Sequence, residues 1–290
     1  MLFFFQVIAS GLTLGSIYAL TALGFVIIFR STAVVNFAQG EMMMVGAILA
    51  LTLYKDYGFG YIPAFLLALV GSWLLGVLIE RLAYRPLIHA PIFTVILSTV
   101  AVGQMLRSGV RVVRGQELSL FPAILNAEPF TWAGIRLTPL NLGIVAASLL
   151  FLVAFVAFFR WTRTGWAMRA TAQNKEAAAL VGVSVAGVFS LSWGISAALA
   201  AAAGILLAPL IIITPDMGII GIKGFIAAIL GGFNSLPGAV LGGFLLGVLE
   251  NLAGVYVSSA FKDVVTFCAL LAVLTVRPAG ILGKPEVRRA

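Results

Sequence analysis

The sequence predicts an all-α protein that crosses a membrane many times. Of its 290 residues, 62% are hydrophobic and only 10% are charged, and the mean hydropathy is +1.13. A soluble domain carries about 25% charged residues, so this chain could not cover itself with a water-soluble surface. Stretches of about twenty apolar residues recur, which is the length of a membrane-spanning helix, whereas the alternation typical of outer-membrane strands is missing. We therefore expect one transmembrane domain over residues 1–290.

The charge and the cysteine content exclude several other classes of protein. The net charge of +8 fits Lys and Arg retained in cytoplasmic loops better than a nucleic-acid-binding surface. The single cysteine, Cys268, excludes an internal disulfide. The first positive charge is Arg30, so no basic segment precedes the first apolar run and we expect no cleavable signal peptide.

The first half of the chain contains four expected spans. The first runs from about Phe3 to Phe29 and carries Gly11-x-x-x-Gly15, a motif that lets another helix pack closely. The third and fourth cover roughly 61–82 and 91–106. The second begins near Val34 and is interrupted by the polar or small residues Asn36, Gln39, Gly40 and Glu41.

A mixed loop is expected over 107–139. It begins with Arg107, Arg111 and Arg114, whose spacing places them on one helical face. We expect this face outside the cell, where it either docks a binding protein or anchors the helix at lipid headgroups. Both interpretations stay open from the sequence.

Five further spans are expected in the second half. They cover 140–159, about 186–213, 218–234, 239–257 and 261–276. The segment 218–234 is short, because about 17 residues at 1.5 Å each reach roughly 25 Å, less than the ~30 Å of the hydrocarbon core. We therefore expect nine crossings with the seventh short or broken, and eight as the alternative.

The main polar segment, residues 160–185, separates the fifth and sixth spans. It holds four basic residues and one acid, and its Ala-rich part favours a helix over Trp166–Val181. Gly182 stands where a glycine would end that helix. We expect a short cytoplasmic helix at about 166–182 that is presented to a partner; a solvated loop, the alternative, would be richer in Gly, Ser and Pro.

Basic residues also predict the orientation. With nine crossings, eleven Lys and Arg residues fall on the side of the polar segment and the C-terminal tail, and seven fall on the other side. Cytoplasmic loops retain positive charge, so the polar segment and the tail are expected inside and the N-terminus outside.

No motif of a catalytic, metal or cofactor site stands out. There is no Walker A sequence, HExxH, cysteine pair or G-x-S-x-G, and the one histidine, His89, falls in a turn. Glu41 and Glu250 lie inside apolar spans, where a charge is costly, so each either pairs with a neighbouring helix or lines a solute path. Interrupted segments at 36–46 and 221–243, one in each half, favour the solute path.

Three segments closely resemble a known family. They are 35–47 (VNFAQGEMMMVGA), 164–185 (TGWAMRATAQNKEAAALVGVSV) and 224–251 (GFIAAILGGFNSLPGAVLGGFLLGVLEN). They are similar to the inner-membrane permease subunits of branched-chain amino acid ABC importers, of the shorter of the two permease types. The resemblance implies a type II importer fold in a bacterial inner membrane. It also implies a second homologous permease subunit, two cytoplasmic ATP-binding subunits and a periplasmic substrate-binding protein.

The resemblance also assigns roles to residues. The polar segment becomes a coupling helix that docks into the ATPase, with Arg169, Ala170, Gln173, Asn174, Lys175, Glu176, Ala177, Ala178 and Gly182 as its matching residues. The expected function is a non-enzymatic permease for leucine, isoleucine or valine. The alternatives are the same type of complex for urea, amides or other amino acids, and an ion-coupled secondary transporter or an intramembrane enzyme that uses Glu41 or Glu250. The hypothetical path or gate comprises Asn36, Gln39, Gly40, Glu41 and Glu250.

Overall fold

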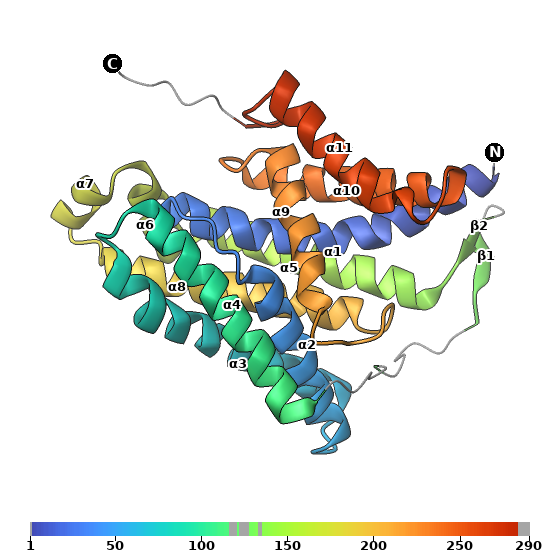
Figure 1. The fold of residues 1–290 in the computed structure, drawn as a ribbon, viewed down its shortest axis with the longest axis horizontal. Helices are drawn as coiled ribbons and strands as arrows, with labels where there is room; N and C mark the ends of the chain where they lie inside the picture. The colour runs from blue at the N-terminus through green and yellow to red at the C-terminus, as the bar shows by residue number, and fades with distance from the viewer. Residues whose placement is uncertain (1, 116–120, 122–127, 133–134, 284–290) are drawn as a thin grey trace.

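The computed structural model describes residues 2–115, 121, 128–132 and 135–283 (Figure 1). Within these ranges the chain is almost entirely helical. Its only strands there are β1 (Phe130–Trp132) and β2 (Ile135–Leu137), which form an antiparallel hairpin. The hairpin lies beside the N-terminus, at the end of the molecule opposite α6 and α7 (Figure 1). The predicted all-α membrane architecture is confirmed.

Helix α1 (Leu2–Thr32) is the central helix and packs against α5, α8, α9 and α10. Its first half meets α10 through glycines, because a Cβ added to Gly11 or Gly15 would lie 2.8 Å from a backbone Cα of α10. Helices in a bilayer associate by such close packing, since lipid is as apolar as their side chains. The packing role expected for Gly11-x-x-x-Gly15 is confirmed.

The helices of the first half extend further than expected at one place. Helix α4 continues past Leu106 to Arg114, so the first part of the expected mixed loop is helical. The physical reason is that its arginines find carboxylates on neighbouring elements, as described below. The helices are α2 (Gln39–Lys55), α3 (Tyr61–Ile79), its π-helical and 3₁₀ extensions η1 (Glu80–Tyr84) and η2 (Arg85–Leu87), α4 (Ile92–Arg114) and α5 (Pro139–Trp161).

The second half begins with two short helices and ends with three that reverse direction at tight turns. Helix α8 stops at Leu207, whereas the span was expected to reach Ile213. The elements are α6 (Arg163–Gln173), α7 (Lys175–Leu180), α8 (Val185–Leu207), η3 (Met217–Ile219), α9 (Ile220–Gly231), α10 (Leu236–Tyr256) and α11 (Phe261–Val276).

Six helices among the described residues are long and apolar enough to cross a membrane: α1, α3 with its extensions, α4, α5, α8 and α10. The other candidates, α2, α9 and α11, have 17, 12 and 16 residues. At 1.5 Å per residue α9 is about 18 Å long, well short of the ~30 Å hydrocarbon core. The seventh segment is short, as expected, and the count of nine crossings stays a prediction.

One end of the bundle gathers α7, the end of α1 and the start of the C-terminal tail. Lys175 Nζ donates to the carbonyl of Thr32 at 3.3 Å. The rings of Phe233, after α9, and Phe29 lie 4.9 Å apart, and Ile281 of the tail donates to Leu230. These contacts place the polar segment and residues 277–283 toward the same end of α1.

Candidate translocation cleft and coupling segment

The first interruption lies between α1 and α2. After Thr32 the chain turns at Ala33, whose φ of 61° is in the left-handed region, and runs unwound to Ala38. Asn36, fully buried, accepts a hydrogen bond from the Ala38 N–H through Oδ1 at 3.1 Å. An Asn side chain that bonds to the backbone two residues on stabilises a turn. Asn36 therefore fixes the backbone just before α2.

Helix α2 begins part-way along α1. Gln39 is buried and donates to the Ser196 carbonyl of α8 at 3.2 Å. The Ser196 hydroxyl in turn lies 2.8 Å from the carbonyl of Gly24, eight residues before the end of α1. Helix α2 therefore starts level with Gly24 and not with the end of α1 at Thr32.

The segment between α8 and α9, residues 208–219, meets the start of α2, whereas the interruption expected at 221–243 contains α9, the turn 232–235 and the start of α10. A Cβ on Gly40 would lie 2.0 Å from the Gly218 carbonyl oxygen, and one on Gly221 would lie 2.3 Å from Gly40 Cα. Since the clashing atoms belong to the backbone, neither glycine can carry a side chain without movement of the chain. The first turns of α2 and α9, from opposite halves of the sequence, are therefore in direct backbone contact.

A row of ion pairs ties both ends of α2 and the residue before η3 to α4. Arg107 donates to Glu41 Oε1 at 2.8 Å and lies 3.7 Å from Asp216, just before η3. Arg111 donates to Asp216 at 2.8 Å. Arg114 pairs with Asp56, which follows α2. The shared arginine face predicted from the spacing is confirmed, and it points at acids of the same chain.

A cleft of about 290 Å³ opens where α2, α4 and η3–α9 meet. Glu41 and Arg107 are its charged residues, Gln104 is polar, and the other lining residues are apolar or glycine. The lining of the cleft is therefore mostly apolar, with one pair of opposite charges. The remaining lining residues are Phe25, Phe37, Gly40, Val100, Gly103, Gln104, Gly218, Ile219, Gly221, Ile222 and Phe225.

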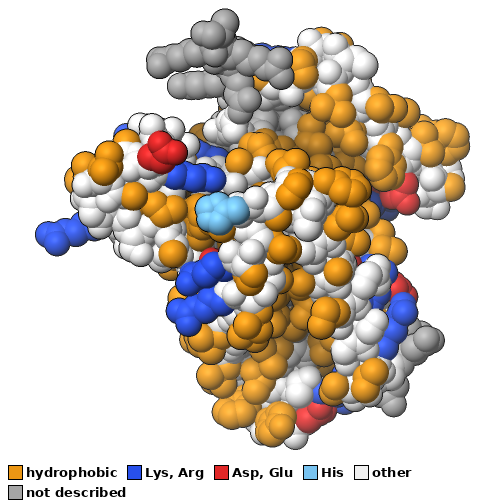
Figure 2. All heavy atoms as spheres, turned by 60° about the vertical axis from the view of Figure 1, so that its left-hand side comes forward, with side chains coloured by type: hydrophobic (Ala, Val, Ile, Leu, Met, Phe, Trp, Pro, Cys, Tyr) orange, Lys and Arg blue, Asp and Glu red, His pale blue; other side chains and the backbone are white. Residues whose placement is uncertain are grey.

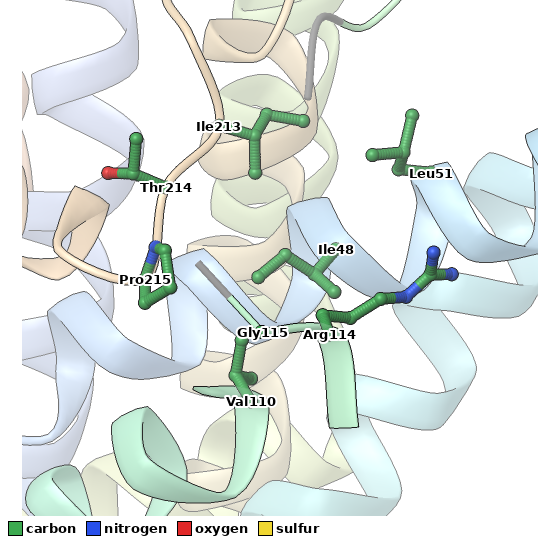
Figure 3. A pocket seen from close by; sticks show the side chains of 8 residues that line it. All are labelled: Ile48, Leu51, Val110, Arg114, Gly115, Ile213, Thr214 and Pro215. Atoms are coloured by element: carbon green, nitrogen blue, oxygen red, sulfur yellow. The ribbon is translucent and has the colours of Figure 1, made fainter. Parts of the chain in front are cut away.

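A second recess lies at the far ends of α2 and α4, against the segment 213–215 (Figure 3). Ile48 and Leu51 of α2 and Val110 of α4 give it apolar walls, and Arg114 lies at its side. Its volume is only about 20 Å³, room for little more than one water molecule. We therefore take the larger cleft as the candidate path.

Glu250 lies in a separate ionic cluster. It is 3% exposed and accepts from Lys223 and, at 2.8 Å, from the Tyr18 hydroxyl. Lys223 also lies 3.1 Å from Asp263. The cluster joins α1, α9, α10 and α11, and none of its members lines the cleft.

The polar segment forms two helices, where one was expected. α6 ends at Gln173, and Asn174 adopts an extended conformation with φ −156°. Its Oδ1 accepts from the Ala177 N–H at 2.9 Å, which caps the first turn of α7. The prediction of a single helix over 166–182 is therefore wrong. A side chain that caps a new helix competes with continuation of the preceding one.

Gly182 ends α7 as predicted. Its φ is +85°, in the region that favours glycine. The Gly182 N–H bonds to Ala179 and the Val183 N–H to Ala178, both at 3.0 Å, which is the pattern of a Schellman motif. The end of α7 is thus a sharp, defined turn.

Helix α7 is anchored on one side and exposed on the other. Ala178 is buried, and Lys175 reaches the end of α1 and lies over the Phe189 ring of α8. This partial burial lowers the pKa of Lys175 from its usual value. Leu180 and Val181 are 89% and 78% exposed, an apolar tip on an otherwise polar segment. Figure 2 shows this end of the molecule, with basic side chains at the edge of a broad hydrophobic surface.

Residues 7–274 match the family model described as "Branched-chain amino acid transport system / permease component". The chain belongs to this family. Its relatives include the high-affinity branched-chain amino acid transport system permease proteins LivH of Salmonella typhimurium and of Escherichia coli K12, each 35% identical over 99% of this chain and 98% of the relative. BraD of Pseudomonas aeruginosa is 34% identical over the same shares.

The family fixes the general class of the permease. It is a multi-pass membrane protein and a transport subunit, which agrees with the resemblance found in the three sequence segments. The match spans the cleft, the ionic clusters and both helices of the polar segment.

The structure brings together only some of the residues that the sequence selected. Gly40 and Glu41 line the cleft of the permease, Asn36 and Gln39 lie behind it, and Glu250 lies apart. Arg107 belongs to the cleft, although its spacing with Arg111 and Arg114 had suggested an outer face that docks a binding protein or anchors the helix at lipid headgroups. The sequence had not selected Ser196 or Asp216, because a lone Ser in a helix or Asp in a loop carries no signal of its partner.

Proposed function

We propose that this chain is the membrane-spanning permease subunit of an ABC importer that translocates leucine, isoleucine and valine. A periplasmic binding protein would deliver the amino acid, and two ATP-binding subunits would drive transport from the cytoplasmic side of a bacterial inner membrane. A second homologous permease subunit would complete the path. The observation that carries the proposal is the cleft where the short helices α2 and α9 meet α4, within a chain of this family.

The chemistry of the cleft suits such a substrate. A branched-chain amino acid is a zwitterion with an apolar side chain. The cleft has apolar walls and one pair of opposite charges, Arg107 and Glu41, complementary to a carboxylate and an ammonium group. A permease that must release its substrate should bind it weakly, and few polar groups in the path serve that need.

The ion pairs around Arg107 are proposed to hold the cleft closed between α2 and α9. Arg107 links Glu41 at the start of α2 to Asp216 just before η3. Its side chain is 18% exposed, so this charge remains partly protected from water. Movement of α9 away from α2 would open the glycine contact and draw Asp216 from Arg107. Glu41 then acts as an acceptor that holds the interruption, and not as a carrier of protons.

The exposed tip of α7 is proposed as the contact with the ATPase. Leu180 and Val181 would enter an apolar groove, in the way that helix-in-groove complexes form. Movement of α7 would reach α1 through Lys175 and Thr32, and α8 through Phe189. Since α8 holds Gln39 through Ser196, the contacts lead from the docking site to the start of α2.

Arg111 and Arg114 keep a proposed role in binding-protein docking. Their side chains are 42% and 31% exposed and are already paired with Asp216 and Asp56. Carboxylates of a binding protein would therefore have to share or replace these partners. Exposed pairs of this kind mainly affect association rate and salt dependence. Anchoring at lipid headgroups is the alternative role.

Reconstitution tests the function. The permease, assembled with its ATPases and binding protein in liposomes, should take up labelled leucine, isoleucine and valine only when ATP is supplied. Labelled urea, acetamide and glutamate serve as competing substrates. Uptake of one of these in place of leucine would identify another substrate class. Leucine uptake driven by an ion gradient without ATPases would instead support a secondary transporter.

A further inference from the structure

A groove between α3 and α8 carries basic groups at one end and apolar groups at the other. It has a volume of about 490 Å³ and lies at the end of the bundle near the polar segment. One wall is formed by Trp73 and Val77 of α3, Arg81 of η1 and Arg85 of η2, which follow one another at four-residue intervals. The facing wall also changes from polar to apolar. It begins with Ser184, the N-cap of α8, near the arginines and reaches Leu191 of α8 deeper in the groove.

The charge in the groove is positive. Glu80 is 1% exposed, and Arg85 binds both of its oxygens, at 3.1 and 2.9 Å. The Ser190 hydroxyl also donates to Glu80 at 2.7 Å, so this carboxylate is fully used by its neighbours. Arg81 is exposed and has no carboxylate partner within the described part of the chain. The guanidinium of Arg81 therefore lacks an ionic partner, whereas that of Arg85 beside it is neutralised by Glu80.

The surroundings of the groove belong to the membrane-facing surface. Leu74 and Leu78 of α3 and Leu82 of η1, beside the groove, are 55%, 51% and 70% exposed. Side chains of this kind on a membrane protein contact acyl chains. Figure 2 likewise shows basic side chains directly beside a broad hydrophobic surface. A ligand of this groove must therefore have an anionic end near the water interface and an apolar remainder.

We propose that the groove binds an anionic phospholipid. The headgroup phosphate lies against Arg81, with Arg85 and the Ser184 hydroxyl nearby, and an acyl chain follows Val77 and Leu191 toward Trp73. Basic pockets between membrane helices at the interface bind anionic lipid headgroups. A free phosphate ion would use only the basic end. An acidic protein surface could not reach the apolar part, which lies below the interface.

Lipid retention by the purified complex tests the proposal. The whole transporter, in nanodiscs of mixed phosphatidylglycerol and phosphatidylcholine, is transferred to detergent, and the retained lipids are counted by native mass spectrometry. The wild type should retain phosphatidylglycerol in preference to phosphatidylcholine. Arg81→Gln should lower that preference about fivefold, the effect of one basic residue near an anionic membrane surface. Arg81→Lys should keep most of it.

Two further variants separate the two parts of the site. Arg163→Gln removes an exposed arginine of α6 outside the groove and should leave the preference unchanged. Val77→Trp fills the apolar part and should reduce retention of both lipids while the complex still elutes as one assembled species. Arg85 is left intact, because its loss would leave Glu80 buried without its ionic partner.

Three outcomes would overturn the proposal. Equal retention of the two lipids by the wild type would remove the charge preference. Displacement of phosphatidylglycerol by millimolar inorganic phosphate would identify a site for a free anion. Loss of the ATP-binding subunits from Arg81→Gln, with lipid preference intact, would identify a protein contact instead.

Discussion

Glu41 is the residue whose surroundings explain most about the cleft. It is 8% exposed, follows the Gly40–Gly221 contact and accepts from Arg107 at 2.8 Å. The carboxylate therefore has a partner that offsets the cost of its burial. If Glu41 is a structural acceptor, transport depends on its hydrogen bond from Arg107 and not on a proton that it could transfer.

Replacement of Glu41 tests this role. Glu41→Gln keeps an acceptor for Arg107 and should transport leucine nearly as well as the wild type. Glu41→Ala leaves a largely buried arginine without this partner, and breaking buried pairs costs about 3–5 kcal/mol, so transport should fail. ATP-driven uptake in proteoliposomes measures both. If Glu41→Gln is as inactive as Glu41→Ala, the charge itself is needed and an ion-coupled mechanism gains support.

Gly40 offers a second prediction at this scale. In Gly40→Ala the new Cβ would lie 2.0 Å from the Gly218 carbonyl oxygen, so α2 and α9 must separate. Overpacking of this kind costs about 1–3 kcal/mol, and the melting temperature in detergent should fall. Gly109→Ala in α4 is the matched control, because a Cβ there has no neighbour within 4 Å. Equal melting temperatures for the two variants would contradict the close contact.

The sequence placed the interruptions at 36–46 and 221–243, whereas the α-helices break at 33–38 and 208–219, and it did not predict the partners of the polar residues. Polar residues inside an apolar stretch are costly in lipid, which is why Asn36 and Glu41 could be recognised. The partner of Glu41, Arg107, is 66 residues away. The four-residue spacing of the arginines predicts a common face and leaves open the direction in which that face points. Only packing of α4 against α2 decides it.

At the scale of elements, the break between α6 and α7 was the main feature that propensity missed. The run around Ala177–Ala179 favours a helix, and so does most of α6. Asn174 carries the opposing signal, since Asn is a strong N-cap and Glu176 follows in the first turn of α7, where an acid is favourable. A single capping side chain thus outweighed the propensity of the whole segment.

The cap itself can be tested. Asn174→Ala removes the acceptor for the Ala177 N–H, a loss of about 1 kcal/mol, and should weaken coupling between ATP hydrolysis and uptake. Asn174→Asp keeps an acceptor and should behave like the wild type. The readout is leucine imported per ATP hydrolysed. Identical ratios in all three proteins would show that the geometry of α7 does not matter for coupling.

Ala178→Pro is the stronger change to the same element. It removes the hydrogen bond from the Ala178 N–H to Asn174, 3.0 Å long, at a position that is 3% exposed. Proline within a helix costs about 3 kcal/mol or more. The protein should insert into the membrane at normal levels and fail to transport. Normal uptake in reconstituted vesicles would defeat the assignment of α7 as the coupling helix.

At the scale of the whole molecule, two kinds of observation predict one orientation. Lys175 contacts the end of α1, and the tail contacts the end of α9, so α7 and residues 277–283 share an end of the bundle. Basic residues are more frequent on that side, which predicts that it is cytoplasmic.

Leu180→Cys and Arg277→Cys, each in a Cys268→Ala background, should therefore resist a membrane-impermeant maleimide in intact cells and react after permeabilisation. Tyr57→Cys, 72% exposed between α2 and α3, should react in intact cells. Labelling of Arg277→Cys alone would mean that the tail emerges on the other side from α7, against the contacts seen here. Labelling of both, with Tyr57→Cys protected, would invert the whole bundle and place α7 where no ATPase could bind it.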